Sequence, residues 1–255
     1  MSSNDDRWDA RPDPMLVRAV RPLVRAMSVL HPSKVEGIER VPRRGGALLV
    51  GNHGMLGYES PFFFERVLAA CGRLPIGLAD RWFFRVPGIR DVLVRLGGAY
   101  GSAANGLRAL RRGELVVCYP GGAREVFKSE ADKYRCLWER SVGFVRLAIA
   151  TGVPIVPFAA AGVDDTYRVV THLRGSGKIL MGHGKYDLPV VWGVGPLPRP
   201  VPFWFRFGEP ILPPRHVKST DRDAVLETHA RIWRHTQRMV DDLVGAWTRV
   251  HARAA

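Results

Sequence analysis

The chain has 255 residues, 46% of them hydrophobic and 9% aromatic, which is enough for one sizeable folded domain and excludes a mainly disordered protein. Its cysteines (Cys71, Cys118 and Cys136) are too few and too irregularly spaced for a disulfide scaffold or a metal site, which favours a reducing compartment. No apolar stretch reaches the roughly 18 residues needed to span a membrane, and we expect no signal peptide.

The charge balance points to an anionic partner. Lys and Arg total 38 against 24 acidic residues, for a formal net charge of +14. Nucleic acid, an anionic membrane surface or an acidic substrate such as a coenzyme A ester would each suit this charge. The charge is spread along the chain and does not choose among them. No nucleic-acid-binding motif is present, and the Trp and Phe residues cluster among prolines rather than among lysines, so we expect no nucleic-acid partner.

The first 30 residues are expected to form a unit of their own, ahead of one domain over residues 31–255. Residues 1–14 are a polar lead-in. A helix is predicted over 15–30, with Pro22 either kinking it or starting a second one, and with apolar positions at Leu16, Val20, Leu23, Met27 and Leu30. Arg18, Arg21 and Arg25 lie off that stripe, so the helix suits either a membrane interface or packing on its own domain.

The middle of the chain alternates predicted strands and helices joined by short glycine-bearing links. Strands are expected within 45–51, 74–79, 114–122 and 153–162, and helices within 60–72, 102–113 and 141–152. Ser60 and Ser102 are the predicted N-caps of the first two helices. This order predicts an α/β fold with a mainly parallel sheet flanked by helices.

Two later segments are distinct. Residues 185–212 are rich in proline and aromatic residues, including Trp192, Phe203, Trp204 and Phe205, which could line an acyl pocket, touch a bilayer or, for about half of them, face the core. Residues 221–251 predict a long helix whose core-facing stripe would contain Leu226, Trp233, Val240, Leu243, Trp247 and Val250.

One segment carries a candidate general base. His53 follows the first hydrophobic strand in a glycine-bearing loop, and ligand sites of open α/β sheets form outside such strand ends. Imidazole titrates near neutral pH and can accept a proton from an alcohol. Glu59 is close enough in sequence to turn back and orient it. A lone loop histidine is more often a structural hydrogen bonder, so this signal is weak by itself.

A second strand ends in the turn Tyr119-Pro120-Gly121-Gly122-Ala123-Arg124-Glu125. Glycines let backbone N–H groups approach a ligand oxygen, and an arginine can hold a phosphate or carboxylate. An ordinary turn with a surface ion pair fits these residues equally well. Cys118, one residue earlier in an apolar run, is better explained as a buried hydrophobe than as a nucleophile.

Together these segments resemble the glycerolipid acyltransferase superfamily. The Asn52-His53 pair, YPGGARE (119–125) and VPIVPF (153–158) occur in the order and rough spacing of that family, with KVEGIERVP before and FRFGEPI (205–211) after them. The PGGARE segment followed by Phe127, Lys128, Trp138 and Gly143-Phe144 looks most like its monoacylglycerol/diacylglycerol acyltransferase-like branch.

The resemblance implies transfer of a fatty acyl group from acyl-CoA, or from acyl carrier protein, to a lipid alcohol, with no cofactor or metal. His53 would be the general base. The family places an Asp after four intervening residues, but that position is Tyr58 here, so Glu59 is the candidate partner. The candidate substrate-binding residues are Asn52, Gly121, Gly122, Ala123, Arg124, Glu125 and Lys128.

A second departure bears on the acceptor. Family members that use phosphate-bearing acceptors carry a Glu where this chain has Gly121, and an Arg in a segment that here, over residues 97–106, contains none. The resemblance therefore favours a neutral glyceride or long-chain alcohol, and peripheral attachment to the cytoplasmic face of a membrane. The alternatives are a lysophospholipid or 1-acylglycerol-3-phosphate acyltransferase, with Arg124 or Lys128 on the phosphate, and a non-catalytic lipid-binding protein.

Overall fold

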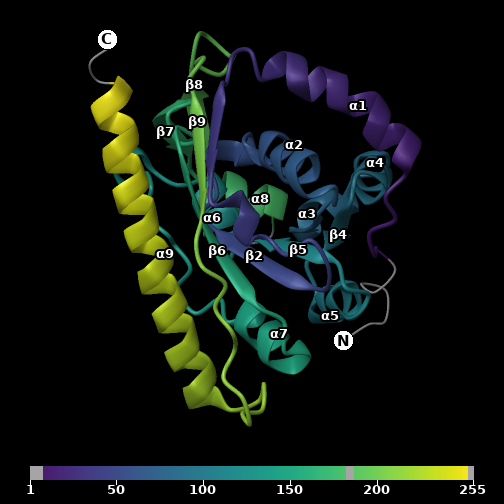
Figure 1. The fold of residues 1–255 in the computed structure, drawn as a ribbon. Coiled ribbons are helices and arrows are strands. Elements are labelled where there is room, and N and C mark those ends of the chain that lie inside the picture. Colours follow the sequence, from purple (N-terminus) through teal and green to yellow (C-terminus); the bar gives the residue numbers. More distant parts are fainter. Residues whose placement is uncertain (1–7, 182–186, 252–255) are drawn as a thin grey trace.

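The protein is built on a mixed sheet whose strands are ordered β1-β9-β6-β2-β5-β3-β4 in the computed structural model, which describes residues 8–181 and 187–251 (Figure 1). β6, β2, β5, β3 and β4 run parallel, whereas β9 pairs antiparallel with β6 and parallel with β1. The strands are β1 (Ser33–Glu36), β2 (Ala47–Gly51), β3 (Ile76–Ala79), β4 (Gly98–Tyr100), β5 (Leu115–Cys118), β6 (Ile155–Ala161) and β9 (Phe203–Phe207). The expected mainly parallel α/β fold is confirmed.

Helices cover both faces of this sheet (Figure 1). Successive residues of a strand point to opposite faces, so Leu48 packs toward α5, α7 and α9 while Leu49 packs toward α1 and α2. The helices are α1 (Pro14–Met27), α2 (Ser60–Cys71), α3 (Arg81–Arg85), α4 (Ile89–Arg95), α5 (Ala103–Arg111), α6 (Ala123–Val126), α7 (Gly143–Thr151), α8 (Ser176–Met181) and α9 (Arg222–His251). Central strands are therefore buried on both sides, which explains their continuous apolar sequences.

Most helix boundaries agree with the sequence to within two residues, but α1 ends at Met27, three residues before the predicted end, and one expected cap is absent. Ser102 caps α5 by accepting the backbone N–H of Asn105, and Gly72 and Gly152 end α2 and α7 with positive φ. The expected Ser60 cap is wrong: Ser60 is the first residue of α2, and Glu59 precedes it without a side-chain cap bond. The carboxylate of Glu59 contacts the ring of His53 instead.

The N-terminal segment packs closely on the domain. α1 continues through Pro22 as one helix, and its buried residue is Val24, whereas Leu23 of the predicted stripe is exposed. Arg21 and Arg25 both bind the carboxylate of Glu65 on α2, at 2.8 and 2.7 Å. Residues 8–13 are also attached, because their backbone bonds to β4 and α4, so the described part of the lead-in is not loose. The domain boundary at residue 31 stays a prediction.

The aromatic segment divides between core and surface. Residues 185 and 186 lie outside the described residues. Phe203 and Phe205 on β9 are buried and Trp204 faces α9, whereas Trp192 is exposed on β8 (Leu188–Trp192), which pairs with β7 (Arg168–Leu173) in a separate two-stranded sheet. The long C-terminal helix is confirmed as α9, and Val240 and Leu243 of the predicted stripe are buried. The rest of its buried face differs from that stripe and contains Val225, Thr228, His229, Ile232 and Thr236.

Candidate active site

His53 is held at the carboxyl end of β2 by the residue before it. The buried side-chain amide of Asn52 donates to the carbonyl of Ala160 at 3.0 Å and accepts its N–H at 2.8 Å. These two bonds extend the pairing of β2 with β6 by one further step, using a side chain in place of backbone. Asn52 therefore fixes where the chain leaves the sheet, and its amide is occupied by protein rather than open to a substrate.

The loop after His53 turns back sharply and brings Glu59 to the imidazole. Leu56 and Gly57 both adopt positive φ, 57° and 68°, in the short 3-10 turn η3 (Met55–Gly57). After this turn Oε1 of the buried Glu59 accepts a hydrogen bond from Nδ1 of His53 at 2.6 Å. An extra residue in the loop is thus accommodated by a left-handed turn, and the two predicted catalytic residues lie in contact.

Tyr58, at the position where the family has its acid, points to another part of the molecule. Its hydroxyl lies 3.1 Å from Nε2 of His31, whose Nδ1 donates to the carbonyl of Val201. Burial lowers the pKa of His31, so the ring is neutral and its Nε2 accepts from Tyr58. Tyr58 thereby ties the loop over residues 53–59, which we call the catalytic loop after its predicted role, to the segment between α1 and β1.

Electrostatics favour an ionised Glu59 beside the imidazole. Burial alone would raise the pKa of this carboxyl, but its electrostatic interaction with His53 and the hydrogen bond from that ring outweigh burial and lower the pKa. A carboxylate on Nδ1 fixes the tautomer in which the other ring nitrogen, Nε2, can accept a proton. The pair has the chemical properties of a general base with its orienting acid.

Tyr119 stacks on His53 and was not among the predicted site residues. The two ring centroids are 3.8 Å apart, and the planes differ by 10°. Burial raises the pKa of the Tyr119 hydroxyl well above its usual value, so the ring is a neutral phenol. Tyr119 follows β5 directly, and the adjacent carboxyl ends of β2 and β5 would have predicted its place beside His53.

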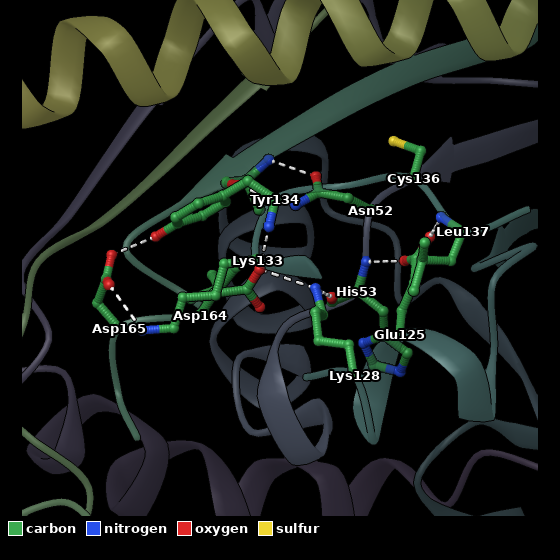
Figure 2. Close-up of polar contacts among 12 residues, drawn as sticks. Asn52, His53, Glu125, Lys128, Lys133, Tyr134, Cys136, Leu137, Asp164 and Asp165 are labelled. Atoms are coloured by element: carbon green, nitrogen blue, oxygen red, sulfur yellow. Dashed lines mark hydrogen bonds and ion pairs between the residues drawn. The ribbon is translucent and has the colours of Figure 1, made fainter. Parts of the chain in front are cut away.

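Glu125 fixes the backbone of His53 by a hydrogen bond. One carboxylate oxygen accepts the His53 N–H at 2.6 Å, and the other accepts the Leu137 N–H at 2.9 Å (Figure 2). The side chain is fully buried, and burial raises its pKa to about 7. Gly121 makes this arrangement possible, because a Cβ there would lie 2.3 Å from the carboxyl carbon of Glu125. Glu125 therefore fixes the backbone of His53, and both of its carboxylate oxygens are bonded within the protein.

Lys128 forms a buried ion pair beside Glu125. Its ammonium group donates to the His53 carbonyl and to Asp164, both at 2.8 Å, and neither side chain is exposed (Figure 2). Burial would lower the pKa of Lys128, but the charges of Asp164 and Glu125 raise it. Sequence reasoning missed Asp164, although it follows β6 at the same edge of the sheet. The structure thus gives Lys128 a position different from the expected substrate contact.

Arg124 holds the loop that follows α6. Its guanidinium group donates to the carbonyls of Leu137 and Trp138, the carboxylate of Glu139 and the hydroxyl of Ser141. Gly122, with φ of 51°, and Ala123 form the turn into α6, and Val126 of that helix lies against Gly57. The predicted substrate-binding segment, residues 121–128, therefore packs against the catalytic loop, and we call it the floor of the site. Its polar side chains form hydrogen bonds and ion pairs with other residues of the protein.

Comparisons with known proteins agree with this fold. The profile of the Acyltransferase family matches residues 32–161, about half of the chain. A crystal structure of the 1-acyl-sn-glycerophosphate (LPA) acyltransferase PlsC from Thermotoga maritima is similar in fold, with a TM-score of 0.55 and 16% identity over 88% of this chain and 79% of that one. The chain belongs to the Acyltransferase family, and the expected superfamily is confirmed.

Curated relatives share part of their length with this chain. It is 29% identical over 141 residues to the "DGAT1/2-independent enzyme synthesizing storage lipids" of Bos taurus, covering 55% of this chain and 42% of that protein. It is 31% identical over 218 residues to an uncharacterized protein of Mycobacterium tuberculosis, covering 82% of this chain and 60% of that protein. The chain thus spans less than two thirds of either relative.

Proposed function

We propose that the protein transfers a fatty acyl group from acyl-CoA to the hydroxyl of a lipid alcohol. Nε2 of His53 takes the proton of the acceptor hydroxyl as its oxygen attacks the thioester carbonyl, forming the ester bond and releasing the coenzyme A thiolate. The imidazolium then returns its proton to that thiolate. Glu59 holds the required tautomer and offsets the positive charge that develops on the ring. An acyl carrier protein thioester would react by the same steps.

The observation that carries this proposal is the 2.6 Å contact between His53 and Glu59. Each neighbour of His53 restricts one part of it. Glu125 and Lys128 hold its N–H and its carbonyl, and Tyr119 stacks on its ring. General-base catalysis depends on such fixed geometry, because the base must lie within hydrogen-bond reach of the proton it removes.

A neutral acceptor, such as a mono- or diacylglycerol or a long-chain alcohol, is the one we favour. The cations named as phosphate ligands in the alternative are both occupied, Arg124 by its own loop and Lys128 by the buried Asp164. The bovine relative is named for storage-lipid synthesis, which accords with a neutral product. A lysophospholipid or 1-acylglycerol-3-phosphate acceptor is the competing proposal, and an acceptor panel distinguishes the two.

Such an acceptor resides in a bilayer, so we propose peripheral attachment to the cytoplasmic face of a membrane. Within the described residues, no helix combines the length and the apolar character needed to cross a bilayer. A net charge of +14 favours an anionic lipid surface, at about 1 kcal/mol for each Lys or Arg near the headgroups.

The test is release of coenzyme A from palmitoyl-CoA, offered with monoacylglycerol, diacylglycerol, a long-chain alcohol and lysophosphatidate in turn. His53→Ala should lower acceptor-dependent release by roughly 10²- to 10⁴-fold. His235→Ala, on α9, is the matched control and should keep the wild-type rate. A folded His53→Ala protein with near wild-type release would contradict the proposal, and a preference for lysophosphatidate would support the competing acceptor.

A further inference from the structure

The β7–β8 hairpin covers the catalytic loop with its inner face. Val169 of β7 and Val191 of β8 pack with Tyr167 against the buried Met55, two residues after His53. His172 adds a hydrogen bond to the carbonyl of Phe127, next to the floor residue Lys128. The hairpin is therefore fixed to the site by one face, and its other face is free of the main sheet.

That outer face is apolar and exposed. A Trp and five aliphatic residues of the hairpin and the turn after it are between 37% and 65% exposed: Val170, Leu173, Val190, Trp192, Val194 and Leu197. The ladder of β7 and β8 places them close together, because Val190 lies opposite Thr171, between Val170 and the pair Leu173–Leu188, and the chain continues from Trp192 to Val194, which bridges to Leu197. Single exposed apolar residues are ordinary, but a contiguous set marks an interaction surface.

Cations border this apolar face. Arg168 stands across from Trp192 at one end of the hairpin, and Arg174 and Lys178 follow β7 at the other end, all three exposed. The acids of this region are turned to backbone groups: Glu130 accepts the N–H of Val169, and Asp187 accepts that of Gly177. An exposed Trp among aliphatic residues with a basic border suits the headgroup layer of an anionic bilayer, whereas the same border would repel a second copy.

We propose that the outer face of the β7–β8 hairpin is the surface by which the protein docks on an anionic lipid bilayer. Docking there places the bilayer on the far side of the hairpin from Met55, so the loop that carries His53 lies one layer of residues from the membrane. This inference rests on the proposed function for its occupant, because only an acceptor that resides in the bilayer requires it.

The test is flotation of the purified full chain with vesicles of phosphatidylcholine containing about a quarter phosphatidylglycerol. The double variant Val190→Asp/Trp192→Asp should bind at least about tenfold more weakly than wild type, because it loses two apolar contacts and gains charges that anionic lipid repels. Leu212→Asp is the matched control, since Leu212 and Trp192 are both 59% exposed. Leu212 follows Ile211, which bridges to the first residue of β6. Leu212 is therefore near the amino ends of the parallel strands, whereas His53 follows a carboxyl end.

A further variant tests whether α1, which also carries exposed apolar and basic residues, is the docking surface instead. Leu23 on α1 is 61% exposed and lies near Arg25, so Leu23→Asp examines whether α1 does the docking. Unchanged binding by the hairpin variant, or an equal loss in Leu212→Asp or Leu23→Asp, would overturn the proposal. A wild-type dimer that dissociates in the hairpin variant, measured by sedimentation, would also overturn it by showing that a second copy occupies the face.

Vesicle binding is measured without turnover, so it separates this inference from the proposed activity. If wild type binds vesicles and the hairpin variant does not, while neither releases coenzyme A, the docking surface stands and the proposed function fails. If both are active on a water-soluble short-chain monoacylglycerol, the variant should keep its kcat there and lose activity only on vesicle-borne acceptor. Equal loss on both acceptors would contradict a docking role.

Discussion

Glu59 accepts a hydrogen bond from Nδ1 of His53 at 2.6 Å from a position one residue later than the family's usual acid. The left-handed turn at Leu56 and Gly57 closes the longer loop, and Tyr58 is directed away to His31. The pairing of a histidine with a buried carboxylate is thus kept although the spacing differs.

Removing the charge of Glu59 should impair catalysis without unfolding the protein. Glu59→Gln keeps the shape but lets the imidazole adopt either tautomer, so we expect kcat for coenzyme A release to fall at least about tenfold. The exposed Glu227→Gln on α9 is the control and should be neutral. Equal rates for Glu59→Gln and wild type would show that another group orients His53.

Restoring the family's spacing should not restore the activity. We expect Tyr58→Asp in the Glu59→Gln background to remain as slow as Glu59→Gln alone, because residue 58 points to His31 rather than His53. The single Tyr58→Asp variant should also lose stability, since it removes packing of the ring on Phe62 and Phe203. Recovery of the rate in the double variant would mean that the loop can adopt both registers.

Gly57 borders the reactive edge of the imidazole. A Cβ there would lie 3.0 Å from Cε1 and 3.3 Å from Nε2 of His53. Gly72 offers a matched control, because its φ of 70° is close to the 68° of Gly57 and a Cβ there meets nothing within 4 Å. Both Ala variants should lose about 1 kcal/mol of stability from the positive φ. Only Gly57→Ala should lose activity, and an equal effect of the two on kcat would contradict this geometry.

The contributions of Lys128 and Asp164 to the free energy of unfolding should be coupled. Lys128→Met leaves Asp164 buried without its cation, which is expected to cost about 3 kcal/mol in the free energy of unfolding. The double variant Lys128→Met/Asp164→Asn should recover part of that loss, because no unpaired charge stays buried. Urea denaturation of wild type, Lys128→Met, Asp164→Asn and the double variant measures the coupling, and strictly additive losses would argue against the pair.

Glu125 should give the protein a pH-dependent stability. Its pKa is about 7 when folded against an ordinary 4.5, so the unfolded chain loses this proton at lower pH than the folded one. Its contribution is therefore complete below about pH 4.5 and lost as the pH rises through about 7, by up to about 3 kcal/mol. Relative to Glu125→Gln, wild type should become less stable across that window. A constant difference between the two would refute the raised pKa.

The sequence predicted the site best where residues that interact chemically are also close along the chain. His53 and Glu59 were predicted to meet because a loop histidine at a strand end needs a nearby acid, and the structure places the two side chains in contact. The burial of Glu125 and Lys128 could not be predicted, since a carboxylate or an ammonium group beside a glycine turn resembles a substrate ligand until its protein partners are known. Tyr119 follows β5 and Asp164 follows β6, and the order of the strands in the sheet brings Tyr119 to the His53 ring and Asp164 to Lys128.

Helix faces were the least predictable feature. Apolar spacing alone placed Leu23 of α1 on the buried face, but the ion pairs of Arg21 and Arg25 with Glu65 turn Val24 inward instead. In α9, the predicted core residues Trp233 and Val250 are exposed, whereas the polar Thr228 and Thr236 are buried on the face that packs on the sheet. The periodicity therefore predicted both helices and part of each buried face, because Val20 and Met27 of α1 and Val240, Leu243 and Trp247 of α9 do pack on the core. Tertiary partners decided the remaining positions.

The most direct test of the proposed chemistry is detection of the ester product itself. Purified protein, palmitoyl-CoA and a diacylglycerol acceptor are incubated, and the acylated lipid is quantified by mass spectrometry beside free palmitate. Wild type should form the new ester, and His53→Ala, shown to be folded by circular dichroism, should form at least about a hundredfold less. Palmitate without ester from any acceptor of the panel, or undiminished ester from His53→Ala, would contradict acyl transfer by His53.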